Sequence, residues 1–365
     1  MVARQQLPTH DSWFAPFSID LVLKVFYVTF LHPFVAWMVV LCFRAEHMAW
    51  DAMPLRVSVA YAALVSAGWM LAAIDRRIAL GPPRNVDSSD QVIVITGGAS
   101  GLGLLIAEVY GMRGASVAVL DVKEMADSEA RGVAFYRCDV SDKAQVIQAA
   151  VDIERDLGSP TVLINNAAIV NGKRLLDLDY DDIDRALSTN LASHFYTLKA
   201  FLPGIARSKL GGTIVTITSV LGELGAAQLS DYAASKAGVS ALHRSLAAEL
   251  RTSHPNICTV LVTLGQLSTP LFHGVQTPSS FFAPVVEPID VAKDVISAID
   301  NGRAESIGMP LYARWVGWYH VLPQSLQKVA RWASGVDTAM ATFVGRKAAA
   351  DTASASKKGP AVKLD

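Results

Sequence analysis

The sequence predicts an α/β fold, a doubly wound parallel sheet preceded by two N-terminal apolar, membrane-associated helices. From residue 91 onward, short β-branched runs alternate with stretches of helical character, and a glycine-rich turn follows the first run. Two long apolar stretches lie upstream of these runs. Apolar strands that alternate with helices are typical of βαβ units, whose right-handed crossovers cover a parallel sheet on both faces.

The alternation runs from a strand over residues 91–96 to a short strand near residues 305–309. The other expected strands cover residues 116–121, 133–140, 161–168, 212–219 and 256–264. The expected helices cover residues 102–113, 142–156, 180–208, 230–252 and 288–301. This order predicts a Rossmann-type domain.

The composition narrows the function classes. Of the 365 residues, 52% are hydrophobic and 18% are charged, which is more apolar than a typical soluble enzyme. The net charge of −1 gives no overall field that would attract nucleic acid. Cys42, Cys138 and Cys258 are scattered, which predicts neither a disulfide framework nor a metal site. We expect no nucleic-acid partner and no bound metal.

The apolar surplus lies in residues 21–43 and 55–74. Each stretch is about the 20 residues that a helix needs to cross a bilayer core. They are too long and too closely paired for a cleaved signal peptide. We expect a membrane-anchoring hairpin or a monotopic insertion, kinked at Pro33, and the alternative is a pair of buried helices packed on the following domain.

Basic residues suggest an orientation for these segments. Arg76, Arg77 and Arg84 follow the second segment, so the positive-inside rule places the following domain in the cytosol. Arg44 and Arg56 lie in the short connection and would also suit a shallow hairpin.

Composition divides the chain into six parts. They are an N-terminal segment (1–20), a membrane-anchoring helical hairpin (21–80), a linker (81–90), a nucleotide-binding catalytic domain (91–310), C-terminal amphipathic helices (311–346) and a disordered tail (347–365). The C-terminal helices could cover the substrate cleft or lie on the membrane. The loop over residues 266–287 is expected to form a substrate lid.

A glycine turn follows the first strand and precedes a helix. Gly97, Gly101 and Gly103 permit a tight turn, so that a pyrophosphate can approach the helix N-terminus. Asp121 ends the second strand, where a carboxylate accepts hydrogen bonds from ribose hydroxyls and repels a 2′-phosphate. We therefore expect NAD rather than NADP, with Lys123 as the one nearby cation. An ordinary strand-to-helix turn is the alternative.

A proton-transfer group lies further along the chain. Tyr232 and Lys236 are one helical turn apart, and Ser219 ends a strand upstream. A nearby cation lowers the pKa of a tyrosine, which Lys236 could do while it bonds the nicotinamide ribose. Ser219 would hold the substrate oxygen while Tyr232 exchanges a proton and a nicotinamide exchanges a hydride. Asn190 could organise a water that passes protons to Lys236, or it could be a buried asparagine bonded to the backbone.

These residues resemble the short-chain dehydrogenase/reductase family, with its TGxxxGxG, NNAG, serine, YxxxK and asparagine motifs, over about residues 90–310. The resemblance implies a catalytic tetrad of Ser219, Tyr232, Lys236 and Asn190. It implies cofactor contacts from Gly97, Ser100, Gly101, Leu102, Gly103, Asp121, Asp139, Val140, Asn166, Ala167, Tyr232, Lys236 and Thr269. Ala168 replaces the last glycine of NNAG, and the loop before Thr269 lacks the usual Pro-Gly pair.

With its apolar N-terminus, the chain is similar to the membrane-associated branch that holds retinol dehydrogenase 10-like and 17β-hydroxysteroid dehydrogenase 11-like enzymes. That resemblance implies an oxidoreductase on the endoplasmic reticulum or a lipid droplet, acting with NAD on CH-OH groups of a retinoid, steroid or long-chain alcohol. A homodimer is possible. The alternatives are a non-catalytic membrane scaffold that kept the fold and a tethered reductase of a small secondary metabolite.

Overall fold

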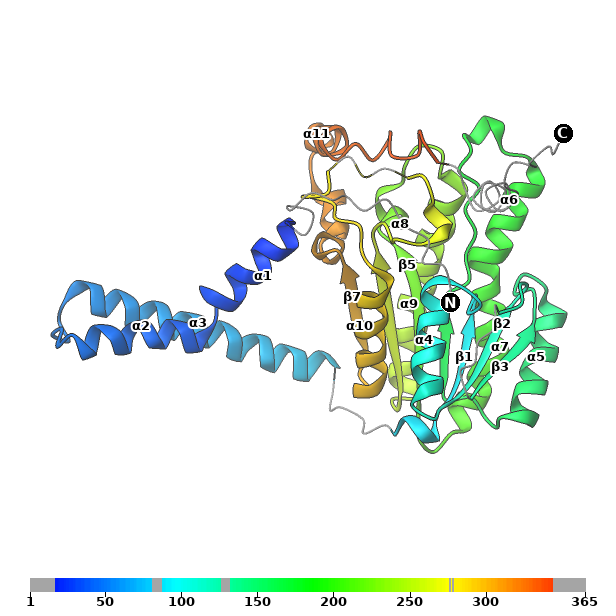
Figure 1. Cartoon of the computed structure of the whole chain (residues 1–365), viewed down its shortest axis with the longest axis horizontal. Helices are drawn as coiled ribbons and strands as arrows, with labels where there is room; N and C mark the ends of the chain where they lie inside the picture. Colours follow the sequence, from blue (N-terminus) through cyan, green and yellow to red (C-terminus); the bar gives the residue numbers. More distant parts are fainter. Residues whose placement is uncertain (1–16, 81–86, 126–131, 276, 278, 344–365) are drawn as a thin grey trace, which may run out of the picture. The chain divides into compact units, whose positions relative to one another are not determined.

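The computed structural model describes residues 17–80, 87–125, 132–275, 277 and 279–343 (Figure 1). The chain divides into an N-terminal unit, up to Pro82 with Ser280–Phe282, and a sheet unit that holds the remainder from Pro83 onward. The expectations for residues 1–16, for most of the linker and for the tail fall outside the described residues.

Seven parallel strands form the sheet unit, in the order β3-β2-β1-β4-β5-β6-β7. The strands are β1 (Val92–Thr96), β2 (Ser116–Asp121), β3 (Val133–Arg137), β4 (Val162–Asn165), β5 (Gly212–Ser219), β6 (Ile257–Leu264) and β7 (Glu305–Met309). The order reverses between β1 and β4, which makes the switch point where such sheets bind ligands. The prediction of a doubly wound parallel sheet is confirmed.

Helices cover both faces of this sheet (Figure 1). One face carries α4 (Gly101–Met112) and α10 (Pro288–Asn301), and the other carries α5 (Lys143–Asp156), α7 (Ser193–Arg207) and α9 (Ser230–Ser253). Three shorter helices complete the unit, namely α6 (Tyr180–Leu187), α8 (Leu221–Leu224) and α11 (Gln324–Ser334).

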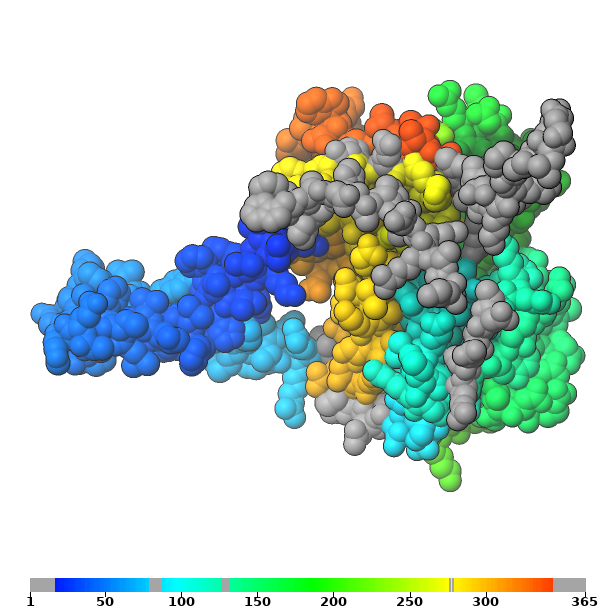
Figure 2. Space-filling view, in the orientation of Figure 1, coloured from blue at the N-terminus to red at the C-terminus, as the bar shows by residue number. Residues whose placement is uncertain are grey.

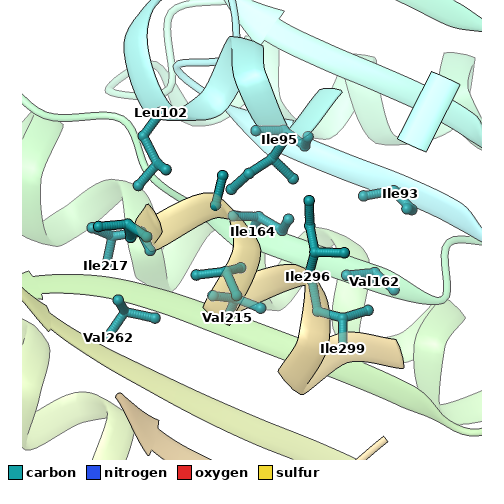
Figure 3. Packing of buried hydrophobic residues seen from close by; sticks show 14 of the residues in the cluster. Ile93, Ile95, Leu102, Val162, Ile164, Val215, Ile217, Val262, Ile296 and Ile299 are labelled. Atoms are coloured by element: carbon teal, nitrogen blue, oxygen red, sulfur yellow. The ribbon is translucent and has the colours of Figure 1, made fainter. Parts of the chain in front are cut away.

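Alternating strand residues supply the two cores. In Figure 3, Leu102 of α4 and Ile296 and Ile299 of α10 pack with Ile95 and Ile164 of the sheet. The residues between them, such as Val94 and Leu163, join the core on the opposite face. A β-strand directs successive side chains to opposite faces, so strands that are apolar throughout are buried on both.

Three expected elements differ in detail. The helix expected over residues 180–208 forms without a break, as α6 and α7 joined by a π-helical turn at Ser188–Ala192. The strands expected over 133–140 and 161–168 end early, at Arg137 and Asn165. Beyond β4 the Asn166 N–H donates to the Thr96 hydroxyl (3.0 Å). Beyond β3 the Cys138 N–H still donates to the Asp121 carbonyl oxygen, and the Asp139 N–H then donates to the Gln145 side chain (2.9 Å).

The N-terminal unit contains α1 (Ile19–Thr29), α2 (Pro33–Ala45) and α3 (Met53–Leu80). α1 and α2 are bent by 49° at the break before Pro33, where the sequence predicts a kink. Within the described residues, Met53–Ile78 is the one helix long and apolar enough to cross a membrane, or one of two if the bent pair forms a single span.

The break between α1 and α2 is bonded by aromatic side chains of α3. The Tyr61 hydroxyl donates a hydrogen bond to the Phe30 carbonyl oxygen (2.5 Å), and Trp69 Nε1 donates to the Leu31 carbonyl oxygen (2.7 Å). Carbonyl groups at a helix end have no partner within their own helix. The third helix therefore satisfies two backbone acceptors that the break exposes.

Candidate active site

A cleft of about 1010 Å³ lies at the carboxyl ends of the strands. Among the site residues predicted from the sequence, Gly103 and Asn190 do not line it. The others all do, namely Gly97, Ser100, Gly101, Leu102, Asp121, Asp139, Val140, Asn166, Ala167, Ser219, Tyr232, Lys236 and Thr269. The fold therefore brings the glycine turn and the Ser-Tyr-Lys group to one cavity.

The glycine turn needs its glycines for close packing. Gly97 has φ 64°, and a Cβ built there would lie 2.8 Å from Ala167 Cα. Gly103 does not line the cleft, but a Cβ there would lie 2.6 Å from the Gly97 carbonyl oxygen. Asn166 Nδ2 donates hydrogen bonds to the carbonyl oxygens of Thr96 (3.2 Å) and Gly97 (3.0 Å). Asn166, the residue after β4, thus holds the turn against the start of α4, while the N–H groups of Asn166 and Ala167 donate to the Thr96 hydroxyl in place of a strand partner.

Helix α4 begins at this turn with Gly101, whose φ is 60°. The backbone N–H groups of a helix's first turn have no intrahelical partners, and they attract anions. Ser100, Gly101 and Leu102 all line the cleft here. The turn can therefore hold the pyrophosphate of a dinucleotide, as its sequence predicts.

Asp121 lies at the end of β2 beside the same turn. One carboxylate oxygen accepts a hydrogen bond from the Ala99 N–H (3.1 Å), and the other accepts one from the Lys123 N–H (3.1 Å). These two bonds fix the carboxylate in the cleft wall, and each oxygen keeps a further lone pair. The group can accept hydrogen bonds from ribose hydroxyls there.

Asp139 and Val140 follow β3 in a tight turn. The Asp139 carboxylate accepts hydrogen bonds from the Ser141 N–H (2.9 Å) and hydroxyl (2.7 Å), and the Asp139 N–H donates to Gln145 Oε1 (2.9 Å). The bond to Gln145 of α5 takes the backbone away from β2 and ends β3. Val140 is buried and lines the cleft, as a contact for an adenine ring requires.

The proton-transfer residues converge from β5 and α9. Ser219 is the last residue of β5, and Tyr232 and Lys236 lie on the first two turns of α9. Lys236 Nζ lies 5.7 Å from the centroid of the Tyr232 ring and donates a hydrogen bond to the Ile217 carbonyl oxygen (3.0 Å). All three side chains are buried, with 5% or less of their area exposed.

Burial controls the ionisation of this group. It raises the pKa of Tyr232, and the hydrogen bond with Ser219 offsets only part of that effect. Burial also lowers the pKa of Lys236, to about 8. In the protein alone, burial of the phenolate therefore outweighs the lowering of the Tyr232 pKa that a neighbouring cation is expected to cause. At neutral pH Tyr232 is a neutral phenol that can donate a proton.

Asn190 lies in the π-helical turn and is fully buried. Its Nδ2 donates a hydrogen bond to the Ile169 carbonyl oxygen (2.9 Å), and its Oδ1 accepts one from the Ile169 N–H (2.8 Å). Of the two roles considered for Asn190, bonding to the backbone describes its side chain. The pair of bonds fixes the chain after β4, and Ile169 itself lines the cleft.

Thr269 lines the cleft beside the glycine turn. A Cβ built on Gly101 would lie 3.7 Å from Thr269 Cγ2, so the threonine side chain lies close to the glycine turn. Thr269 precedes a 3₁₀ turn over Pro270–Phe272. The loop thus brings its threonine to the cleft without the Pro-Gly pair.

Three apolar residues near Tyr232 come from segments that the sequence associates with the substrate cleft, namely the loop over 266–287 and the C-terminal segment over 311–346. The Phe272 ring meets the Tyr232 ring edge-on, with centroids 5.8 Å apart and planes at 87°. Met340 and Phe343, from the end of the described chain, pack in the same cluster. No motif marks the two C-terminal residues, because their contact with Tyr232 spans about 100 positions of sequence.

Residues 91–279 match the family model described as short chain dehydrogenase. Short-chain dehydrogenase/reductase 3 of Homo sapiens is 31% identical over 275 residues, which are 73% of this chain and 90% of that protein. Retinol dehydrogenase 10 of Homo sapiens is 31% identical over 253 residues, 60% of this chain and 74% of that protein. Among solved structures, ligand-free aldohexose dehydrogenase of Thermoplasma acidophilum shares the fold, with 24% identity and a TM-score of 0.53, over 60% of this chain and 92% of that one.

Proposed function

This chain belongs to the short-chain dehydrogenase family and is an oxidoreductase, and from that premise we propose that it moves a hydride between NAD(H) and a lipophilic alcohol or carbonyl compound at a membrane. The observation that carries the proposal is the shared cleft. Ser219, Tyr232 and Lys236 line the same cavity as the glycine turn and Asp121.

The cleft fits a dinucleotide at one end. The turn at Gly97 and Gly101 lets a pyrophosphate approach the first N–H groups of α4, and Asp121 is placed for the ribose hydroxyls. The Asp121 carboxylate would repel a 2′-phosphate, which supports NAD over NADP. When bound, the nicotinamide supplies the hydride acceptor or donor.

At the other end of the cleft, Ser219, Tyr232 and Lys236 are placed to transfer a proton to or from the substrate oxygen. Ser219 bonds Tyr232 and can hold the substrate oxygen beside it. Since burial keeps Tyr232 protonated, it can donate its proton to a carbonyl oxygen, and this form favours reduction at neutral pH. In the oxidation direction Tyr232 starts as the phenolate, its proton having gone to solvent, and accepts the proton of the substrate hydroxyl as the hydride leaves for the nicotinamide. The Lys236 ammonium nearby stabilises that phenolate.

The apolar surroundings of Tyr232 support a lipophilic substrate. Leu229, Phe272 and Val275 pack in the cluster that contains Tyr232. The similarity to retinol dehydrogenase 10 points the same way. A retinoid, a steroid or a long-chain alcohol is the substrate class that we propose.

The N-terminal unit supports a membrane location. Met53–Ile78 has a mean hydropathy of 1.8, and only 11% of its apolar window is buried in the protein. Trp69 and Tyr61 satisfy the carbonyls at the helix break, and lipid offers no water to do so. Arg76 and Arg77 lie near the end of this helix, which by the positive-inside rule supports a sheet unit that faces the cytosol. We propose the endoplasmic reticulum or a lipid droplet as the membrane.

The direct test is turnover by the full-length protein in detergent. Retinoid, steroid and long-chain aldehydes are offered with NADH, and the absorbance of NADH is followed. Tyr232→Phe should abolish turnover, whereas Tyr180→Phe, at a tyrosine that is 87% exposed, should leave it unchanged. Turnover that survives in Tyr232→Phe contradicts the mechanism.

A further inference from the structure

The last described residues of the chain reach the substrate end of the cleft. We call residues 335–343 the C-terminal closing segment. Met340 is 3% exposed and shares a cluster with Tyr232 and Leu229, and Phe343 packs against that cluster. Phe343 also lines the cleft. A substrate whose oxygen reaches Tyr232 must therefore lie beside this segment.

Phe343 packs directly against Gly172, which also lines the cleft. Gly172 lies in the chain that follows β4 and has φ 67°. A Cβ built there would lie 2.2 Å from Phe343 Cδ1 and 3.3 Å from Met340 Cε. Any side chain at Gly172 would displace Phe343, so the glycine leaves room for the ring.

Two sets of polar contacts hold the closing segment in place. The Thr342 hydroxyl donates a hydrogen bond to the Gly274 carbonyl oxygen (2.7 Å), which joins the segment to the loop after β6. Arg331 of α11 donates to the Leu224 carbonyl oxygen (2.7 Å) and to the Asp337 carboxylate (3.0 Å). Figure 2 shows the segment and α11, in red and orange, at the same end of the sheet unit as the yellow loop after β6.

We propose that Phe343, which lines the cleft, and Met340, which is buried behind it in the Tyr232 cluster, are specificity-determining residues. Together they form an apolar wall beside Tyr232 that selects an apolar group next to the reacting carbon. The proposal rests on the proposed function and names its selecting residues. Apolar surface on the substrate gains by leaving water against this wall. A hydroxyl or charge placed against these two apolar side chains would lose hydration without gaining a hydrogen bond from them, so polar analogues are disfavoured.

The test compares substrates in the full-length protein. Dodecanal and butanal are reduced with NADH by the wild type, Met340→Ala, Phe343→Ala and the control Trp332→Ala, at a side chain that is 84% exposed on α11. We expect kcat/KM for dodecanal to fall about 10-fold in the two wall variants, mainly through KM. For butanal it should change less than about 2-fold, and the control should match the wild type.

Two further variants keep the test independent of folding. Phe343→Leu retains an apolar side chain and should recover most of the preference for dodecanal. Thr342→Val removes the bond to Gly274 and should lower that preference through KM while kcat for butanal stays constant. The proposal would be contradicted if kcat/KM fell equally for dodecanal and butanal in the wall variants, or if the ratio of the two kcat/KM values were unchanged in Phe343→Ala.

A binding measurement separates this inference from the proposed function. The fluorescence of parinaryl alcohol, a long-chain alcohol, reports binding without turnover. If the wild type binds the probe more tightly than Phe343→Ala does but reduces no aldehyde, the inference about the apolar wall is supported and the proposed function is contradicted. If the wild type reduces aldehydes but Phe343→Ala changes neither the affinity for the probe nor the chain-length preference, only the inference about the apolar wall is contradicted.

Discussion

The Lys236 ammonium lies 5.7 Å from the centroid of the Tyr232 ring, and its one hydrogen bond to the backbone goes to the Ile217 carbonyl oxygen. The lysine is thus held by β5, one turn along α9 from the tyrosine. Both groups are buried, so each disfavours its charged form. This relationship decides how the reaction should depend on pH.

We expect the reduction of an aldehyde to be fastest near neutral pH and to slow above about pH 8, where Lys236 loses its proton. Oxidation should instead accelerate as pH rises to about 8, because the raised pKa of Tyr232 makes its basic form scarce at neutral pH, and level off above that pH as Lys236 loses the charge that stabilises the phenolate. Profiles of kcat/KM in both directions test this. Lys236→Arg, which keeps its charge, should move the fall in reduction to higher pH. A fall that begins below pH 6 would contradict the assignment.

Asp121→Ser should weaken the binding of NADH by about 10-fold, because a charged acceptor of ribose hydroxyls is lost. Adding Val122→Arg should improve the binding of NADPH, since the arginine attracts its 2′-phosphate. Fluorescence titration gives both Kd values. Asp290→Asn, at an exposed carboxylate on α10, is the matched control. A wild type that prefers NADPH would contradict the proposed cofactor.

Asn190→Ala should destabilise the protein by about 2 kcal/mol or more, because the N–H and the carbonyl of Ile169 lose their partners in a buried site. Thermal unfolding should show a Tm lower by roughly 5 °C. The loop after β4 would also shift, so kcat should fall. Asn301→Ala, at an exposed position that ends α10, should leave both quantities unchanged. An unaltered Tm in Asn190→Ala would show that these bonds do not stabilise the fold.

Two buried histidines predict loss of stability in acid. Burial lowers the pKa of His194 to about 3 and that of His243 to about 4. Below about pH 6.5 the unfolded chain binds protons at these positions and the folded chain does not. Stability is therefore complete above that pH and falls by about 1.4 kcal/mol per unit for each histidine, down to about pH 4.

The matched variant for this effect is His243→Asn. It can keep a hydrogen bond to the Thr216 hydroxyl, which His243 Nδ1 contacts at 2.9 Å. Thermal unfolding between pH 4.5 and 8 should show a shallower decline in this variant than in the wild type. Parallel curves for the two proteins would exclude His243 as a source of the acid sensitivity.

Leu64→Arg should weaken the proposed insertion of α3 into a membrane. Leu64 lies near the middle of Met53–Ile78 and is 72% exposed, and an arginine at the centre of a spanning helix costs about 3 kcal/mol. Flotation of the full-length protein with lipid vesicles measures the bound fraction. Leu64→Val, which stays apolar, should float as the wild type does. Equal flotation of Leu64→Arg would argue against a buried α3.

Local patterns were sufficient for the fold class and for most of the cleft. The glycine turn, Asp121 and the Tyr232–Lys236 pair are each set by a strand end, a tight turn or a single helical turn, so their spacing in the sequence predicts their placement. The break at Pro33 is equally local, since a proline within a helix removes a hydrogen bond.

The tertiary structure decided what depends on burial and on distant partners. Asn190 pairs with Ile169, and Phe343 reaches the cluster of Tyr232, across separations that no periodicity records. The direction of the Tyr232 pKa follows from its enclosure, not from the neighbouring lysine that the motif displays. The spacing of residues along a chain determines the geometry within one helix or strand. Packing between elements determines which side chains are exposed to solvent, and so determines the charge states of Tyr232 and Lys236 and the apolar wall of the cleft.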